Sequence, residues 1–185
     1  MKKIFAILAL AISGTAFAAD SFTVESQRNN NVGGVAQQTY QLGVKKDLTS
    51  TISGDIGFSN AVTDGTNALG TRLEAGISGA IAKVGPVTLG LRGSIGEKYS
   101  NTTNFSYYTI EPSVSAAVPG VAGLSAKVGW RYRSATASEN NDQTHTMRYT
   151  LAYALTKVDT VGVRYDRVEG DSNQKTVALT YSRGF

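Results

Sequence analysis

An alternation of apolar and polar residues along most of the chain is the feature that most restricts its fold. Beyond the first eighteen residues, no segment contains ten uninterrupted apolar residues, whereas a helix needs about 20 to cross a bilayer. Only helices and closed β-barrels span membranes, because each backbone N–H and C=O must find a partner there. If this chain lies in a membrane, it therefore crosses it as a barrel.

The alternation has a period of two, which is the period of side chains on a β-strand. Met147, Tyr149 and Leu151, for example, alternate with Arg148 and Thr150. Ten such segments follow one another, at about residues 21–28, 35–46, 51–60, 72–81, 87–95, 105–118, 124–133, 146–155, 161–166 and 176–185. The pattern predicts an all-β fold, a ten-stranded antiparallel up-and-down β-barrel.

The last ten residues form one of the most regular of these segments. Val177, Leu179 and Tyr181 share one face, and the chain stops on Phe185. This resembles the closing strand of Gram-negative outer-membrane β-barrels, in which a terminal Phe on an amphipathic strand is the assembly signal. Arg183 departs from the family pattern because it occupies the apolar face, although an arginine near the bilayer edge can extend to water. The resemblance implies that Tyr181 and Phe185 are read by the barrel-assembly machinery, after delivery by periplasmic chaperones.

The first eighteen residues have the character of a secretory signal peptide. Lys2 and Lys3 precede an apolar run from Ile4 to Ile12, and Ala16 to Ala18 supplies a small-residue cleavage site. We therefore expect a cleavable signal peptide at residues 1–18 and one outer-membrane barrel domain at residues 19–185. The chain has no cysteine, which excludes disulfides and thiol chemistry.

Alternation alone does not separate a membrane barrel from a soluble one, because a soluble barrel has the same pattern turned inside out. The aromatic residues favour the membrane, since they gather near predicted strand ends as lipid interfaces favour. The expected outer girdle contains Phe58, Tyr108, Trp130, Tyr132 and Tyr165, and the expected periplasmic girdle contains Phe22, Tyr153, Tyr181 and Phe185. Only 17% of the residues are charged, which is low for a surface that faces water. We expect a transmembrane barrel in contact with outer-membrane lipids, located in the bacterial outer membrane.

The predicted connections differ in length and composition. Those near residues 29–34, 60–70, 98–104, 135–143 and 169–173 are rich in Asn, Ser and Asp, whereas those near 46–50, 84–86, 119–123 and 156–159 are tight. The resemblance implies that the tight turns and both termini face the periplasm and that the longer loops face outward. Pro112 interrupts the sixth segment, where it predicts a bulge or a lost ladder bond. An edge segment that failed to pair would leave eight strands instead of ten.

The polar face of the predicted barrel carries more bases than acids. The charged residues expected to form a network in the lumen are Glu25, Asp55, Arg72, Glu74, Arg92, Glu111, Lys127, Arg131, Arg133, Arg148, Arg164 and Asp166, with Lys45 and Lys98 on the same face. Charges inside a barrel cannot stay dry and unpaired, so one interpretation is a lumen packed with ion pairs. The other is a narrow water path whose positive field favours small anionic solutes.

Three arginines decide between these interpretations. Arg131, Arg133 and Arg148 share a face of two neighbouring segments and repel one another unless carboxylates or anions intervene. Glu111 and Asp166, on the flanking segments, are the expected partners. Complete pairing would make the lumen a plug, and the length of arginine side chains in a ten-stranded barrel favours this. Ten strands lie between the eight that side chains fill and the sixteen that leave an open channel, so both interpretations stay open.

No catalytic, metal or cofactor motif accompanies this pattern. His145 is the only histidine and shares the face of Met147, which aims it outward, whereas enzymes among small barrels, such as omptin-type proteases, combine His with Asp, Ser or Glu. Residues 139–142 lack the spacing of a calcium loop and are expected to form a solvated hairpin tip. The net charge of +4 includes two signal-peptide lysines, so it does not indicate a nucleic-acid partner.

The sequence therefore predicts a non-enzymatic outer-membrane barrel, either a structural barrel or a narrow porin-like channel with an arginine-rich, anion-favouring lumen. A surface adhesin or receptor that acts through its outer loops is the alternative, weakened by the shortness of those loops. An outer-membrane enzyme is the third reading.

Overall fold

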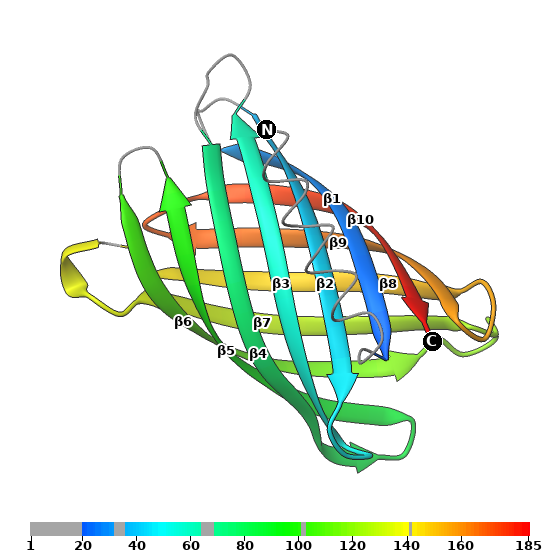
Figure 1. Cartoon of the computed structure of the whole chain (residues 1–185). Coiled ribbons are helices and arrows are strands. Elements are labelled where there is room, and N and C mark those ends of the chain that lie inside the picture. Colours follow the sequence, from blue (N-terminus) through cyan, green and yellow to red (C-terminus); the bar gives the residue numbers. More distant parts are fainter. Residues whose placement is uncertain (1–19, 32–35, 64–68, 101–102, 141) are drawn as a thin grey trace.

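The computed structural model of the chain describes residues 20–31, 36–63, 69–100, 103–140 and 142–185. They form a closed barrel in which every strand is antiparallel to both neighbours and β10 pairs with β1 (Figure 1). The strands are β1 (Ser21–Asn31), β2 (Gln37–Asp47), β3 (Ile52–Thr63), β4 (Leu69–Val84), β5 (Val87–Ser100), β6 (Asn104–Ala117), β7 (Leu124–Ala135), β8 (Thr144–Ala154), β9 (Asp159–Gly170) and β10 (Gln174–Gly184). The structure confirms the predicted ten-stranded barrel; the predicted signal peptide lies outside the described residues.

The outer face of the barrel is apolar. Ile95, Ile77 and Leu179 expose 70%, 60% and 63% of their surface although they lie well inside their strands. A water-soluble fold would leave such a continuous apolar surface only at a binding site, whereas lipid tails cover it without cost. The side chains that face outward are therefore the apolar ones that the alternation predicted to contact lipid. No helix among the described residues is both long enough and apolar enough to cross a membrane.

Aromatic rings gather on the outer face at one end of the barrel. Tyr132 lies 6.0 Å from Tyr108 and 5.3 Å from His145, and His145 stacks on Trp130 at 5.5 Å between ring centroids. Phe58, Trp130 and Tyr165 of the predicted outer girdle each stand seventh in a strand of twelve residues, near the middle of β3, β7 and β9. Tyr165 lies beside another aromatic residue, with its ring centroid 6.3 Å from that of Tyr149 on β8.

Two irregularities interrupt the ladders. At Pro112, β6 keeps its pairing with Leu91 of β5, but the pairing with β7 is missing at Glu111 and Pro112 and resumes in the same register on either side. Proline lacks the N–H that this ladder needs, so the lost bond, and not a bulge, is the outcome there. The bulge lies in β4, where the register with β5 shifts between Ala80 and Ala82.

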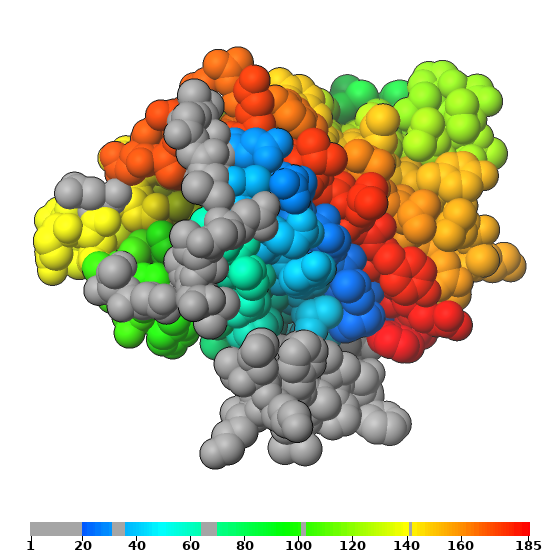
Figure 2. All heavy atoms as spheres, turned by 90° about the horizontal axis from the view of Figure 1, so that it is seen from above, coloured from blue at the N-terminus to red at the C-terminus, as the bar shows by residue number. Residues whose placement is uncertain are grey.

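The seam of the barrel closes at the end that carries residues 20 and 185, called here the terminal end. The Phe185 amide donates to the Asp20 carbonyl oxygen at 3.1 Å, and the Asp20 amide donates to the Lys45 carbonyl oxygen at 2.8 Å. Figure 2 shows β10 (red) packed directly beside β1 (blue) along this seam. A hydrogen bond from the Asp47 amide, followed by one from Lys46, lowers the pKa of the Asp20 carboxyl. The carboxylate therefore stays charged and ties β2 to the start of β1.

The opposite end, called the distal end, carries the connections that follow the odd-numbered strands (Figure 1). Connection length does not separate the two ends as cleanly as predicted. Residues 118–123 at the terminal end form a six-residue turn with Gly120 and Gly123 at φ of 79° and 81°, whereas three residues join β5 to β6 at the distal end. A left-handed backbone is accessible to glycine without strain, which permits the longer turn.

Candidate functional site

Three polar cavities follow one another along the lumen. A distal cavity of about 360 Å³, a central cavity of about 340 Å³ and a terminal cavity of about 390 Å³ share wall residues where they meet. The charged residues common to the distal and central cavities are Arg72, Arg131, Arg148 and Arg164. Those common to the central and terminal cavities are Lys45, Arg92 and Lys127. Each boundary is therefore lined by cations, while most of the carboxylates lie within single cavities.

Arg92 is the centre of one ion cluster. Its Nε and Nη2 donate to the two carboxylate oxygens of Asp55 at 3.0 and 2.5 Å, and its Nη1 donates to Glu74 at 2.7 Å. Glu74 also accepts from Arg131 at 2.6 Å, across the lumen from β7. The two-pronged contact with Asp55 uses the planar fork of the guanidinium, which fixes Arg92 more firmly than a single bond would.

Arg148 and Arg164 organise a second cluster around more deeply buried acids. Arg148 donates to Glu111 at 2.8 Å and through two nitrogens to Asp166 at 3.1 and 3.2 Å. Arg164 donates to Asp166 at 3.0 Å and to both oxygens of Glu25 at 2.6 and 2.9 Å. The side chains of these three acids are 3–7% exposed, so the arginines are what makes their charge tolerable there.

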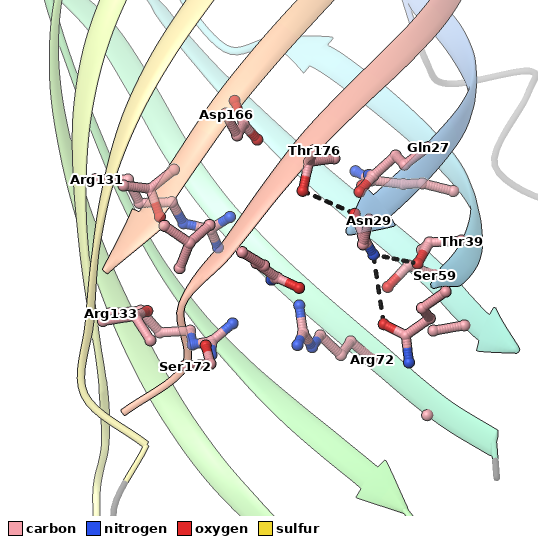
Figure 3. Close-up of a pocket in the computed structure, with 18 of the residues that line it drawn as sticks. Gln27, Asn29, Thr39, Ser59, Arg72, Arg131, Arg133, Asp166, Ser172 and Thr176 are labelled. Carbon is pink, nitrogen blue, oxygen red and sulfur yellow. Dashed lines mark hydrogen bonds between the residues drawn. The ribbon is translucent and has the colours of Figure 1, made fainter. Parts of the chain in front are cut away.

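The distal cavity also contains cations that the two clusters do not neutralise. Arg133 donates to Asp142 at 2.6 Å, and Lys98 lies 4.9 Å above the ring of Phe105. Within the described part of the chain, neither Arg72 nor Lys98 has a carboxylate within 4.0 Å. Figure 3 shows Arg72 on one wall of this cavity with Arg131 and Arg133 on the opposite wall.

The loop between β7 and β8 corrects one prediction. Residues 139–142 were expected to form a solvated tip. Glu139 is exposed as expected, in a short 3₁₀ turn at Ser138–Asn140, but Asp142 is 9% exposed and lines the distal cavity. Asp142 pairs with Arg133, and this provides the physical reason, because a buried guanidinium draws the nearest carboxylate inward.

Tyr107 is a lumen residue that the charge pattern does not reveal. It is 1% exposed, its hydroxyl donates to Glu74 at 3.0 Å, and the guanidinium of Arg133 lies 5.7 Å from its ring. The ring lies against the backbone of Gly96, where a Cβ atom would meet it at 2.5 Å. The sequence signal for this lumen residue is a tyrosine opposite a glycine on the neighbouring strand, because Tyr107 and Gly96 form a cross-strand pair.

All twelve charged residues of the predicted network line the distal or the central cavity. Their pairing differs from the prediction in part. Arg148 takes both Glu111 and Asp166, while Arg131 reaches Glu74 and Arg133 takes the loop residue Asp142. Lys127 contacts Glu111 at 3.6 Å from the terminal side. The lumen is therefore ion-paired around its central cavity, with further cavities on the distal and terminal sides.

The arrangement in the described lumen is a set of ion pairs between arginines and carboxylates. His145 lies on the outer face against Trp130 and Tyr132, away from the cavities. Across the residues that the structure describes, no group of three or more His, Cys, Asp or Glu is placed to hold a metal ion.

No protein-family model and no curated protein matches the sequence. The fold does match solved structures. The COG4313 outer membrane channel from Pseudomonas putida F1 is 11% identical with a TM-score of 0.57, and the match covers 91% of this chain and 96% of that one. The NanC porin is 10% identical with a TM-score of 0.50, covering 89% and 100%. At such low identity the likeness is one of fold: this chain has the closed-barrel fold of outer-membrane β-barrel proteins.

Proposed function

We propose that the protein is a non-enzymatic integral barrel of the bacterial outer membrane whose lumen is a narrow, porin-like path that favours small anions. The observation that carries the proposal is the series of three polar cavities whose shared charged residues are all lysine or arginine. A solute that moves along the lumen passes these cationic boundaries one after the other.

The sign of the preference follows from where the charges lie. A narrow path with low-dielectric walls focuses the field of its lining charges, and rings of Lys or Arg favour anions. Lys127 matters most at the terminal boundary because its side chain is 42% exposed and its contact with Glu111 is long, at 3.6 Å. Such a loosely held cation can contact a passing anion without breaking the ion clusters.

Two other readings make different demands on the molecule. A packed structural barrel needs a lumen that side chains fill, whereas three polar cavities occupy this one. An adhesin or receptor needs a large outer surface, whereas the described distal connections are short, and Asp142 of the longest described one turns into the lumen. The apolar outer face supports contact with outer-membrane lipids in all three cases.

Planar-bilayer recording tests the proposal. The purified protein should give small, steady conductance steps, and a salt gradient should give a reversal potential of the sign expected for anion preference. Lys127→Glu should move that potential towards cations. Lys175→Glu is the matched control, because Lys175 is exposed on the outer face of β10 and does not line a cavity. Absence of conductance steps would overturn the proposal and favour the structural barrel. A reversal potential that indicates cation preference in the unmodified protein would also overturn it.

A further inference from the structure

Arg72 and Lys98 form an arrangement that proteins ordinarily avoid. They stand directly opposite each other in the pairing of β4 with β5, and both side chains point into the distal cavity. Like charges at directly opposed positions of a sheet destabilise it. Among the described residues no carboxylate lies within 4.0 Å of either one. An anion held between them would convert this repulsion into attraction.

The opposite wall of the cavity carries two more guanidinium groups, those of Arg131 and Arg133. Arg131 and Arg133 each spend one terminal nitrogen on a carboxylate, at 2.6 Å to Glu74 and 2.6 Å to Asp142. The Nε atoms of both arginines and Oδ2 of Asp142 are buried and have no hydrogen-bond partner. Buried polar atoms without partners are uncommon, and this group contains an acceptor as well as donors. In Figure 3 the guanidinium groups of Arg72 and Arg133 face each other across the cavity.

The part of the wall that β1, β2 and β10 contribute is polar and uncharged. Asn29 donates to Thr39 at 3.0 Å and accepts from Thr176 at 2.7 Å, and all three side chains are buried (Figure 3). These bonds hold hydroxyl and amide groups at fixed positions opposite the cations. The volume of about 360 Å³ corresponds to roughly a dozen water molecules, which suits a small solute and excludes a polymer chain folded on itself.

We propose that the distal cavity is a binding site for a small oxyanion with two negative charges, of the phosphate type, held between Arg72 and Lys98 with Arg133 on the far wall. Two unneutralised cations call for a dianion, and the guanidinium fork matches the oxygens of such a group. The site lies inside the lumen, which separates it from lipid headgroups on the outer face, so its ligand is a free solute. Its role in solute passage rests on the proposed function; the binding itself does not.

Calorimetric titration of the detergent-solubilised protein with inorganic phosphate tests this, at mildly alkaline pH and with chloride keeping the ionic strength constant. The wild type should bind phosphate saturably at one site. Arg72→Gln and Lys98→Gln should each weaken binding about tenfold, the loss expected for one charged hydrogen bond. Lys175→Gln, which removes a cation from the outer face of β10 near the distal end, should bind as the wild type does.

Thermal unfolding supplies a second readout that a purely structural role would not give. Without phosphate, Arg72→Gln and Lys98→Gln should melt no lower than the wild type, because each relieves the repulsion between the pair. With phosphate, only the wild type and Lys175→Gln should gain stability. Equal phosphate affinity in all four proteins, absence of saturable binding in the wild type, or lowered melting of both lumen variants would overturn the site.

Bilayer recording of the same proteins separates the two proposals. Saturable phosphate binding by a barrel that never conducts would support the binding site and refute the channel. Anion-selective conductance, combined with no saturable phosphate binding by the wild type, would support the channel and refute the binding site.

Discussion

Replacement of Arg148 by methionine should be the most damaging single change in the lumen. The guanidinium makes three hydrogen bonds to two acids, Glu111 and Asp166. Methionine keeps much of the side-chain length and removes the charge. Glu111 then loses its shortest ion pair, and Asp166 loses the only arginine that contacts it through two nitrogens. The side chains of the two acids remain buried, at 3% and 7% exposed. An unpaired buried carboxylate is far more costly than the pair was favourable.

The expected loss of stability depends on which cations still contact the two acids. Removing one partner of a buried ion pair costs roughly 3–5 kcal/mol. Asp166 keeps Arg164 at 3.0 Å, and Glu111 keeps Lys127 at 3.6 Å, so neither acid is left without a cation. We therefore expect the low end of the range, about 3 kcal/mol. Lys127→Met removes a more exposed cation from the same Glu111 and should cost about 1 kcal/mol or less.

Urea titration in lipid vesicles measures both changes, with the fluorescence of Trp130, the single tryptophan, as the signal. The triple variant Arg148→Met, Glu111→Gln, Asp166→Asn should recover most of the lost stability, because it removes the stranded charges together with their partner. Equal losses in Arg148→Met and Lys127→Met, or no recovery in the triple variant, would refute the reasoning that buried carboxylates set the penalty.

Three further predictions concern the outer face, the lumen wall and the loop. Leu151→Arg should lose about 2–4 kcal/mol in the same vesicle assay if this exposed residue faces mid-bilayer lipid, whereas Ser113→Arg, at the wall of the terminal cavity, should lose less. Gly96→Ala should lose about 1–3 kcal/mol, because its Cβ would lie 2.5 Å from the Tyr107 ring; Gly93→Ala, with open space on the same strand, is the control. Asp142→Asn should strengthen phosphate binding several-fold in calorimetry, since it removes the carboxylate that competes for Arg133.

The strands, and which of their side chains point to lipid or into the lumen, were predictable because both are local properties of the sequence. A side-chain period of two survives in the sequence wherever one wall faces lipid and the other faces polar groups. Leu151 and Leu179 could therefore be assigned outward, and Arg148 and Arg164 inward, without knowledge of the tertiary structure. The signal peptide and the assembly role of Tyr181 and Phe185 stay predictions.

The pairing of charges was less predictable because it depends on reach across the lumen. Neighbouring strands placed Arg148 opposite Asp166, and this pair forms. Arg92 stands opposite Glu111 in the ladder and nevertheless turns to Asp55 and Glu74, since Arg148 already holds Glu111. The position of Asp142 depends on how a loop folds, for which alternation carries no information.

The cationic character of the distal cavity does not depend on one choice of rotamers. Glu74 is shared by two arginines, Asp166 by two arginines, and Glu111 by an arginine and a lysine. A rearrangement that brought one of these acids to Arg72 would release another buried cation, because the described lumen holds more bases than acids. The excess positive charge can move along the lumen but cannot be neutralised from within it. In the structure, the two cations without a carboxylate within 4.0 Å, Arg72 and Lys98, border the distal cavity, which is where the proposed anion would bind.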